Sequence, residues 1–292
     1  MNKKWIFLFI LTSCITGFVT GIPEETGSID VFFCDKVNCN IILQDKIAQS
    51  SKANCAMYNP SKELINELNG KGFLATDEEY ASSNTINEFG SGLMHNKFCL
   101  FDNQFVWTGS WNPKQEMSIP NNVVLIESKI IASAFTKEFE EFEKGVFHGG
   151  KSLPGLVKLN GSLIEAYFCP EDNCQERVLE TLETAEDSIY FMTYSFTNDE
   201  IGDLVLDKSK KLVVKGIFDP RKDKKYSEYE KLKDFSKIEK VHHKVFIVDE
   251  KIVITGSYNP TNNGNTRNDE NVVIIHNKEI AGKFVDEFNS LW

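Results

Sequence analysis

The chain carries one sequence pattern twice, with its spacing preserved. Residues 95–112 read HNKFCLFDNQFVWTGSWN, and residues 242–259 read HHKVFIVDEKIVITGSYN. Both stretches fit His-x-Lys-x4-Asp-x6-Gly-Ser-x-Asn. Because six identities recur at fixed positions, coincidence is excluded and the chain is predicted to contain an internal duplication.

The duplication extends over almost the whole chain, with copy one at residues 28–150 and copy two at residues 161–292. Each copy begins with an apolar strand and a Cys-x4-Cys loop, and it ends on an amphipathic helix. Strands and helices alternate between these ends, which predicts an α/β fold of two tandem repeats, each a mixed β-sheet flanked by helices. Gly and Pro residues predict a linker at 148–156.

The copies differ in length between a strand that ends in Tyr58 or Tyr194 and the following His-x-Lys pattern. Copy two is longer here by 11 residues, since the spacing is 37 residues in copy one and 48 in copy two. The extra segment includes the strand-like KLVVKGIFDPR. Copy one is therefore expected to have lost or degraded this strand.

The repeated pattern places polar groups on one face of a strand. Side chains alternate between the two faces of a strand, so residues two apart point the same way. The candidate catalytic residues are His95, Lys97, Ser110, Asn112, His242, Lys244, Ser257 and Asn259. Asp102 and Asp249 have the opposite parity and precede turns, so a structural role is favoured for them, together with Gly109 and Gly256. His243 also faces away and is interpreted as structural or at the surface.

This doubled pattern resembles the signature motif of the phospholipase D superfamily, which both copies match in full. The resemblance implies that the copies meet around a pseudo-twofold axis and share one active site. It further implies cleavage or transfer at a phosphodiester without a metal or other cofactor. Because both motifs lie in one chain, a monomer is expected.

The residue types suit that chemistry, because a phosphodiester is an anion that repels nucleophiles. The two lysines and the two asparagines of the motifs are suited to hold the non-bridging oxygens. One imidazole attacks phosphorus, and the other protonates the leaving oxygen and then activates water. By resemblance to the superfamily, His95 is assigned as the nucleophile and His242 as the acid.

Members of the superfamily often have an acidic residue after the Gly-Ser-x-Asn strand that orients a catalytic histidine. Glu270 fits this place in copy two, whereas the aligned residue of copy one is Asn121. An asparagine does not stabilise an imidazolium as a carboxylate does. The two histidines are therefore expected to have unequal pKa values and unequal roles.

The sequence indicates the type of reaction more specifically than it indicates the substrate. Each copy is close to the minimal unit of the superfamily, which resembles its compact secreted or membrane-anchored nucleases. Residues 208–244 contain 13 Lys/Arg and 6 Asp/Glu, a local charge of +7, whereas the whole chain carries −11. With Tyr226 and Tyr229 interleaved, this segment is suited to a phosphate backbone, although a solvated helix face is the simpler interpretation. Nucleic acid is the preferred substrate. Phospholipase D or phosphatidyl transferase activity and a catalytically decayed binding module are the alternatives.

The N-terminus has the pattern of a targeting segment. A basic flank at 1–4 precedes an apolar run at 5–22, which fits a signal peptide or a membrane anchor. Leu-Thr-Ser-Cys at 11–14 resembles a bacterial lipoprotein box, with Cys14 as the candidate for lipidation. In each case the body of the protein is expected outside the cytoplasm, either secreted or attached to a membrane.

The cysteines agree with an oxidising compartment. Cys34 and Cys39 are separated by four residues, as are Cys169 and Cys174, and each pair is suited to close a small disulfide loop. Zinc binding by these pairs is the alternative, although no histidine lies near them. Cys55 and Cys99 lie in apolar strands and are expected to be buried thiols, with a disulfide between them left open.

Overall fold

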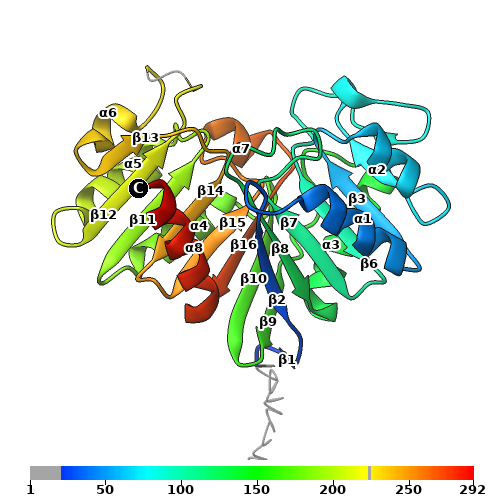
Figure 1. Ribbon diagram of the computed structural model, residues 1–292, viewed down its shortest axis with the longest axis horizontal. Helices are drawn as coiled ribbons and strands as arrows, with labels where there is room; N and C mark the ends of the chain where they lie inside the picture. The colour runs from blue at the N-terminus through cyan, green and yellow to red at the C-terminus, as the bar shows by residue number, and fades with distance from the viewer. Residues whose placement is uncertain (1–20, 223–224) are drawn as a thin grey trace, which may run out of the picture.

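The computed structural model describes residues 21–222 and 225–292, and these form two mixed β-sheets, one for each repeat (Figure 1). The first sheet has seven strands in the spatial order β2-β8-β7-β6-β3-β4-β5. Its strands are β2 (Ile29–Phe33), β3 (Ala53–Met57), β4 (Leu74–Thr76), β5 (Ile86–Asn87), β6 (Lys97–Phe101), β7 (Phe105–Gly109) and β8 (Asn122–Glu127).

The second sheet has nine strands among the described residues, and seven of them repeat the order of the first sheet. The order is β1-β9-β10-β16-β15-β14-β11-β12-β13. The strands are β1 (Glu24–Glu25), β9 (Gly155–Leu159), β10 (Ser162–Cys169), β11 (Ser188–Thr193), β12 (Val213–Phe218), β13 (Ser236–Ile238), β14 (Lys244–Val248), β15 (Ile252–Gly256) and β16 (Glu270–His276). This repetition confirms the predicted fold class of two tandem α/β repeats.

One detail of the predicted organisation is corrected by this topology, and another is confirmed. β9 begins at Gly155, inside the linker predicted at 148–156, because its residues pair with β10 and extend the second sheet. Copy one retains the equivalent strand only in a shortened form, which agrees with the expectation that it was lost or degraded. β4 pairs in parallel with β3, as β12 pairs with β11, but β4 is three residues long and β12 is six.

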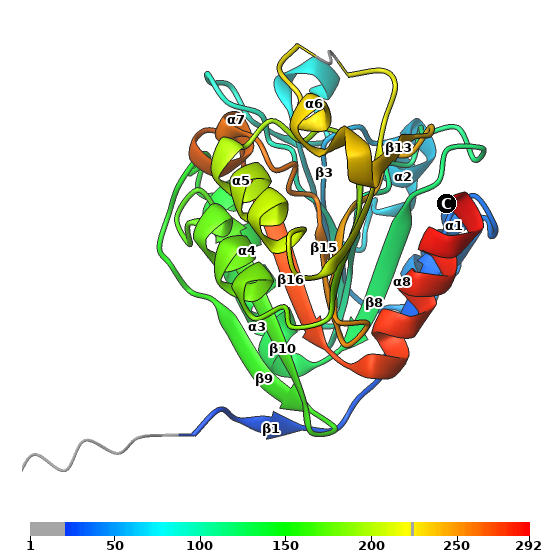
Figure 2. The same ribbon diagram turned by 90° about the vertical axis from the view of Figure 1, so that its left-hand side faces the viewer.

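Helices cover the outer face of each sheet, and one long helix of each repeat lies on the inner side. Figure 2 shows α4 and α5 on one face of the second sheet and α8 on the other. The helices are α1 (Cys39–Gln49), α2 (Lys62–Glu67), α3 (Lys129–Glu143), α4 (Cys174–Glu183), α5 (Asp199–Lys208), α6 (Tyr229–Leu232), α7 (Asn262–Thr266) and α8 (Lys278–Leu291), with short 3-10 helices at Glu78–Tyr80 and Lys233–Phe235.

The two inner helices, α3 and α8, have equivalent N-caps and equivalent buried faces. Ser128 caps α3 by accepting from the backbone N–H of Ile131, and Asn277 caps α8 by accepting from that of Ile280. Phenylalanines at helical spacing then form one buried face on each helix. These residues are Phe135, Phe139 and Phe142 on α3, and Phe284 and Phe288 on α8.

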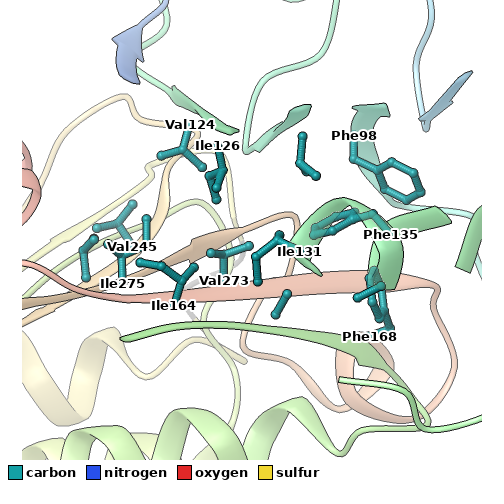
Figure 3. Close-up of a cluster of buried hydrophobic side chains, with 14 of the residues drawn as sticks. Phe98, Val124, Ile126, Ile131, Phe135, Ile164, Phe168, Val245, Val273 and Ile275 are labelled. Carbon is teal, nitrogen blue, oxygen red and sulfur yellow. The ribbon is translucent and has the colours of Figure 1, made fainter. Parts of the chain in front are cut away.

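A single apolar core joins the two repeats. Figure 3 shows Phe98 and Val124 of the first sheet, Ile164 and Val273 of the second, and Phe135 of α3 within one cluster. α3 packs on β9 and β10 of the second repeat as well as on strands of its own sheet. Because this inner face is apolar on both sides, separating the repeats would expose it to water, and the two halves are held together by its burial.

Three disulfides lie among the described residues. Cys34–Cys39 and Cys169–Cys174 close the two predicted loops, which removes these cysteines from zinc binding. Cys55 and Cys99 also form a disulfide, so the expectation of buried thiols is wrong. The reason is register: β3 and β6 are antiparallel, and these two residues lie directly opposite each other.

The predicted targeting segment lies almost wholly outside the described part of the chain. Residues 1–20, including the candidate lipidation site Cys14, are not among the described residues. Within residues 21–222 and 225–292, none of the helices has the length and apolar character needed to cross a bilayer.

The glycine of the repeated motif is required by a close backbone approach. Gly256 has φ +136°, and a Cβ there would lie 2.3 Å from the carbonyl oxygen of Asn271. We expect Gly256→Ala to lower the free energy of unfolding by about 2–3 kcal/mol, because it adds both backbone strain and overlap. As a control, Gly282→Ala in α8 meets nothing within 4 Å and should stabilise by about 0.5–1 kcal/mol. Denaturant unfolding of both variants tests this, and equal effects of the two would contradict it.

Candidate active site

A cavity of about 730 Å³ lies between the repeats, and both motif histidines line it. Asn112 and Asn259 also contribute to its wall, as does α7, which lies near the top of Figure 1. His95 lies two residues before β6 begins at Lys97, and His242 lies two residues before β14 begins at Lys244. The duplication therefore brings the two motifs to one cavity.

Each histidine is fixed by the other repeat. The backbone N–H of His95 donates to the carbonyl oxygen of Asp269 at 3.0 Å, and that of His242 donates to the carbonyl oxygen of Pro120 at 2.7 Å. Asp269 and Pro120 are equivalent residues just before the last strand of each sheet. The position of either imidazole thus depends on the packing of one repeat against the other.

The side chains of the two histidines have different partners. His95 Nδ1 lies 2.8 Å from both carboxylate oxygens of Glu270, whereas His242 Nδ1 lies 2.9 Å from the carbonyl oxygen of Ser110. A carbonyl oxygen only accepts, so Nδ1 of His242 carries a proton. A carboxylate imposes the same tautomer on His95. Nε2 is then the ring nitrogen left to a ligand in the cavity on both sides.

Glu270 orients the histidine of the other repeat, which the sequence did not predict. The motif order placed Glu270 in copy two, but its carboxylate crosses the interface to His95. The aligned Asn121 makes a short contact to its own segment, where its Nδ2 donates to the carbonyl oxygen of Ile119 at 2.6 Å. His242 therefore has no carboxylate partner among the described residues. Only the packing of the repeats decides which histidine receives the carboxylate.

The two motif lysines lie almost fully buried beside the histidines. Lys97 Nζ donates to the carbonyl oxygen of His95 at 2.7 Å, and Lys244 Nζ donates to that of His242 at 3.2 Å. Tyr58 lies against His95 with ring centroids 4.9 Å apart, and its ring centroid is 5.3 Å from Lys97 Nζ. The second repeat contains the same cluster.

In the second repeat the tyrosine is Tyr194. Its ring lies 4.5 Å from that of His242 and 5.5 Å from Lys244 Nζ, and Tyr58 and Tyr194 both line the cavity. Sequence reasoning treated the two tyrosines only as strand ends. Their equivalent places in the two copies were the signal that they belong to the site.

Burial sets the protonation of the whole cluster. It lowers the pKa of His95 and of His242, and the charges of Lys97 and Lys244 lower both further. Burial also lowers the pKa of Lys97 to about 7 and that of Lys244 well below its ordinary value. It raises the pKa of Glu270 to about 8, although Lys97 opposes this. An anion entering the cavity would favour the charged form of every cationic group there.

Comparison with known proteins agrees with this arrangement of paired motifs. The family model described as "Cardiolipin synthase, PLD-like domain" matches residues 33–142 and 178–292, which is most of the chain and both repeats. The chain belongs to the phospholipase D superfamily. It is accordingly an enzyme of the phosphodiesterase type.

Relatives with established names support the same assignment. The phospholipase D of Rickettsia bellii is 32% identical over 144 residues, which cover 46% of this chain and 72% of the relative. A mitochondrial cardiolipin hydrolase of Chlamydomonas reinhardtii is 27% identical over 142 residues, covering 42% of this chain and 63% of that protein. The solved phosphatidylserine synthase of Haemophilus influenzae has a TM-score of 0.67 and 12% identity, covering 92% of this chain and 88% of that one. At that identity it shows the fold alone.

The two motif serines support the site through hydrogen bonds and do not line the cavity. Ser110 Oγ accepts from the backbone N–H of Asn122 at 3.0 Å, and Ser257 Oγ donates to Glu270 at 2.6 Å. Neither serine lines the cavity, although strand alternation had placed serine and asparagine on one face. The reason is that β7 and β15 end at the preceding glycine, so regular alternation stops there.

The motif aspartates lie in tight turns and not in the cavity lining. Asp102 and Asp249 have φ values of 52° and 51°. Asp102 Oδ1 accepts from the backbone N–H groups of residues 51 and 52, and Asp249 accepts from those of residues 186–188. These bonds fix the turn that follows the His-x-Lys strand, which is a structural role. His243 is fully buried and contacts Asn122 and Glu287.

The electrostatic coupling in the site can be measured directly. We expect Lys244→Met to raise the pKa of His242, because the charge of Lys244 is one of the causes that lower it. Lys251→Met, at an exposed lysine outside the cavity, is the control and should leave the pKa of His242 unchanged. Histidine titration by two-dimensional NMR gives both values. An unchanged or lower pKa of His242 in Lys244→Met would show that the lysine does not act on it.

Proposed function

We propose that the chain is an extracytoplasmic nuclease that cleaves DNA or RNA through a phosphohistidine intermediate. The observation that carries this proposal is the polar wall of the cavity. Seven carboxamide side chains contribute to the lining, whereas Leu93 and Ile119 are its aliphatic side chains among the described residues. Such a wall suits phosphates, sugars and bases, and it offers little surface for the acyl chains of a lipid.

Cationic and aromatic groups extend from the cavity into the basic segment 208–244. Arg221 and Lys222 line the cavity, and Asp219 holds Arg221 through two hydrogen bonds of 2.8 and 2.7 Å. Tyr226 is 64% exposed and suited to stack on a base, with Lys225 Nζ 5.1 Å from its ring centroid, whereas Tyr229 packs against Phe218. The positive lip lies on an otherwise acidic molecule, so binding is expected to concentrate here.

The first chemical step uses His95 as the nucleophile. Nε2 of His95 attacks phosphorus, and the P–O bond to the leaving group breaks as the N–P bond forms. His242 gives the proton on its Nε2 to the leaving oxygen. His95 keeps its proton on Nδ1 and becomes cationic, and the nearby carboxylate of Glu270 favours this charge. That stabilisation is available to His95 and not to His242, which is why the nucleophile is assigned to His95.

The second step returns the enzyme to its first state. His242, now neutral, takes a proton from water as the water oxygen attacks phosphorus and the N–P bond breaks. Lys97 and Lys244 neutralise charge on the phosphoryl group through their field, and Asn112 and Asn259 are placed to bind its oxygens. Unequal partners on two equivalent histidines thus give them unequal roles.

The extracytoplasmic part of the proposal is supported by the cysteines. The three disulfides are consistent with this extracytoplasmic location.

Phospholipase D or phosphatidyl transferase activity is the second candidate. It is favoured by the names of the relatives, phospholipase D and cardiolipin hydrolase. Two loops beside the cavity also expose apolar side chains, with Phe89 73% and Met117 51% exposed. Exposed apolar side chains on loops are suited to a lipid surface. Both candidates use the same histidines, so the substrate must be tested directly.

The deciding experiment offers nucleic acid and lipid to the same preparations. The full chain in nonionic detergent, with EDTA present, is given fluorescent single- and double-stranded DNA, RNA, and mixed micelles of phosphatidylcholine or cardiolipin. We expect nucleic-acid cleavage that His95→Ala and His242→Ala each reduce by about 10³-fold or more. His276→Ala is the matched control, because His276 pairs with Glu165 away from the cavity.

The alternative results have clear meanings. Lipid turnover without nucleic-acid cleavage would replace the nuclease with a phospholipase D. If the wild type turns over neither substrate, the binding module becomes the better description. Activity that survives both histidine substitutions would show that another site is responsible.

The pH profile of the reaction follows from the shifted pKa values of the groups in the site. kcat/KM should rise with pH through an apparent pKa below 6.5, since burial lowers the pKa of His95 and the nucleophile must be neutral. It should fall on the alkaline side as His242, which must be protonated to act as the acid and whose pKa burial also lowers, loses its proton. Lys97, with a pKa of about 7, adds to this fall as it loses its charge. Lys97→Arg should move the alkaline limb to higher pH, because a guanidinium stays protonated. An alkaline limb that does not move would assign it to another group.

A further inference from the structure

The two repeats place equivalent residues at two contacts across their interface. α3 and α8 begin at the equivalent caps Ser128 and Asn277, 149 residues apart. The same offset relates Glu138 to Glu287 and Glu141 to Ser290. In the disulfide loops, Glu171 of Cys169–Cys174 corresponds to Lys36 of Cys34–Cys39. Each contact joins the disulfide loop of one repeat to the inner helix of the other.

One of these contacts is completed by a cation. Lys36 Nζ forms an ion pair with the buried carboxylate of Glu287 and donates to Ser290 Oγ at 3.3 Å. His243 Nε2 approaches the other oxygen of Glu287 at 3.3 Å. The Glu287 carboxylate therefore has a positive partner and a second polar contact, as a buried carboxylate requires.

The equivalent contact has the carboxylates but not the cation. Oxygens of Glu138, Glu141 and Glu171 lie within 4.8 Å of one another. Glu138 is only 5% exposed, and no ion pair joins it to a lysine, arginine or histidine in the described parts of the chain. Asn96 takes the place of His243, and its buried Nδ2 has no hydrogen-bond partner.

This cluster of acidic residues differs from an ordinary cluster at the protein surface, because some of its oxygens are buried. Glu171 Oε2 is buried without a hydrogen-bond partner. The nearby Asp269, which is 2% exposed, has His148 as its partner, with His148 Nδ1 3.3 Å from Oδ2 and the His148 backbone N–H donating to Oδ1. Burial raises the pKa of Glu138, with Glu171 and Asp269 adding to the effect. Three carboxylates thus surround the position that an ammonium group occupies in the other half of the molecule.

We propose that Glu138, Glu141 and Glu171 bind a divalent cation, Ca²⁺ by preference, which takes the place of the Lys36 ammonium at the equivalent contact. Ca²⁺ is a hard cation that accepts oxygen ligands in irregular geometry and completes its shell with water, whereas Mg²⁺ demands a near-ideal octahedron. The ligands come from α3 of repeat one and the disulfide loop of repeat two. The cation therefore ties the repeats together outside the catalytic cavity, and the site is independent of the proposed nuclease activity.

The site is tested by the response of thermal stability to Ca²⁺. The full chain in nonionic detergent is stripped with EDTA, and its Tm is followed as CaCl₂ or MgCl₂ is added to millimolar concentration. We expect Ca²⁺ to raise the Tm by on the order of 2–4 °C, with a smaller effect of Mg²⁺, and excess EDTA to reverse it. Calorimetric titration with CaCl₂ should give about one binding site per chain.

The variant Glu171→Lys copies the arrangement of the other half and is the decisive control. It should retain its fold without Ca²⁺, with a Tm in EDTA at or above that of the wild type, and it should lose the response to Ca²⁺. Glu186→Lys makes the same charge change at an exposed residue and should keep the response. Glu138→Gln should also lose it.

Two results would overturn the proposal. If Ca²⁺ leaves the wild-type Tm unchanged, and the Tm instead rises as the pH falls, the carboxyl groups share protons and bind no cation. If Glu171→Lys still responds to Ca²⁺ as the wild type does, the ion binds elsewhere.

Discussion

The contact between the Glu270 carboxylate and the His95 imidazole depends on the fold of each repeat and on the packing of the two repeats against each other. The two residues are 175 positions apart and belong to different repeats. They meet only because the inner faces of both sheets, together with α3, bury a common apolar core. The burial that holds the repeats together also removes water from the site, and this desolvation shifts the pKa values of its histidines and lysines. Stability and chemistry therefore arise from the same interface.

Duplication produced each interfacial contact twice, and divergence then made the members of each pair different. Glu270 and Asn121 are equivalent, as are His243 and Asn96, and as are Lys36 and Glu171. In each pair the position in the repeat is retained while the side chain changes. In the proposed reaction the two equivalent histidines accordingly have the different tasks of nucleophile and acid. The same process can convert an internal ion pair into a place for an external cation.

The cavity rather than the catalytic pair has to decide the substrate. The histidines, lysines and asparagines of the motifs handle a phosphodiester regardless of what is attached to it. What differs between candidate substrates is the surface that surrounds the phosphate. Here that surface is rich in carboxamides and bordered by Arg221 and Lys222, while Phe89 and Met117 project from neighbouring loops. The polar wall is the ground for proposing nucleic acid rather than lipid, because acyl chains require a continuous apolar surface.

The duplication, the fold class, the superfamily and the paired motif residues could be predicted from the sequence, because all of these depend on local periodicity and fixed spacing. The two small disulfide loops could be predicted as well, since their cysteines are close along the chain. Three features became visible only in the folded chain. Glu270 contacts His95, Tyr58 and Tyr194 belong to the site, and Cys55 lies opposite Cys99. Strand register and packing across the pseudo-twofold axis set these contacts, and neither leaves a local pattern. The difference arises from sequence separation. Features at short spacing can be recognised in the sequence, whereas contacts between the repeats form only when the apolar core has packed.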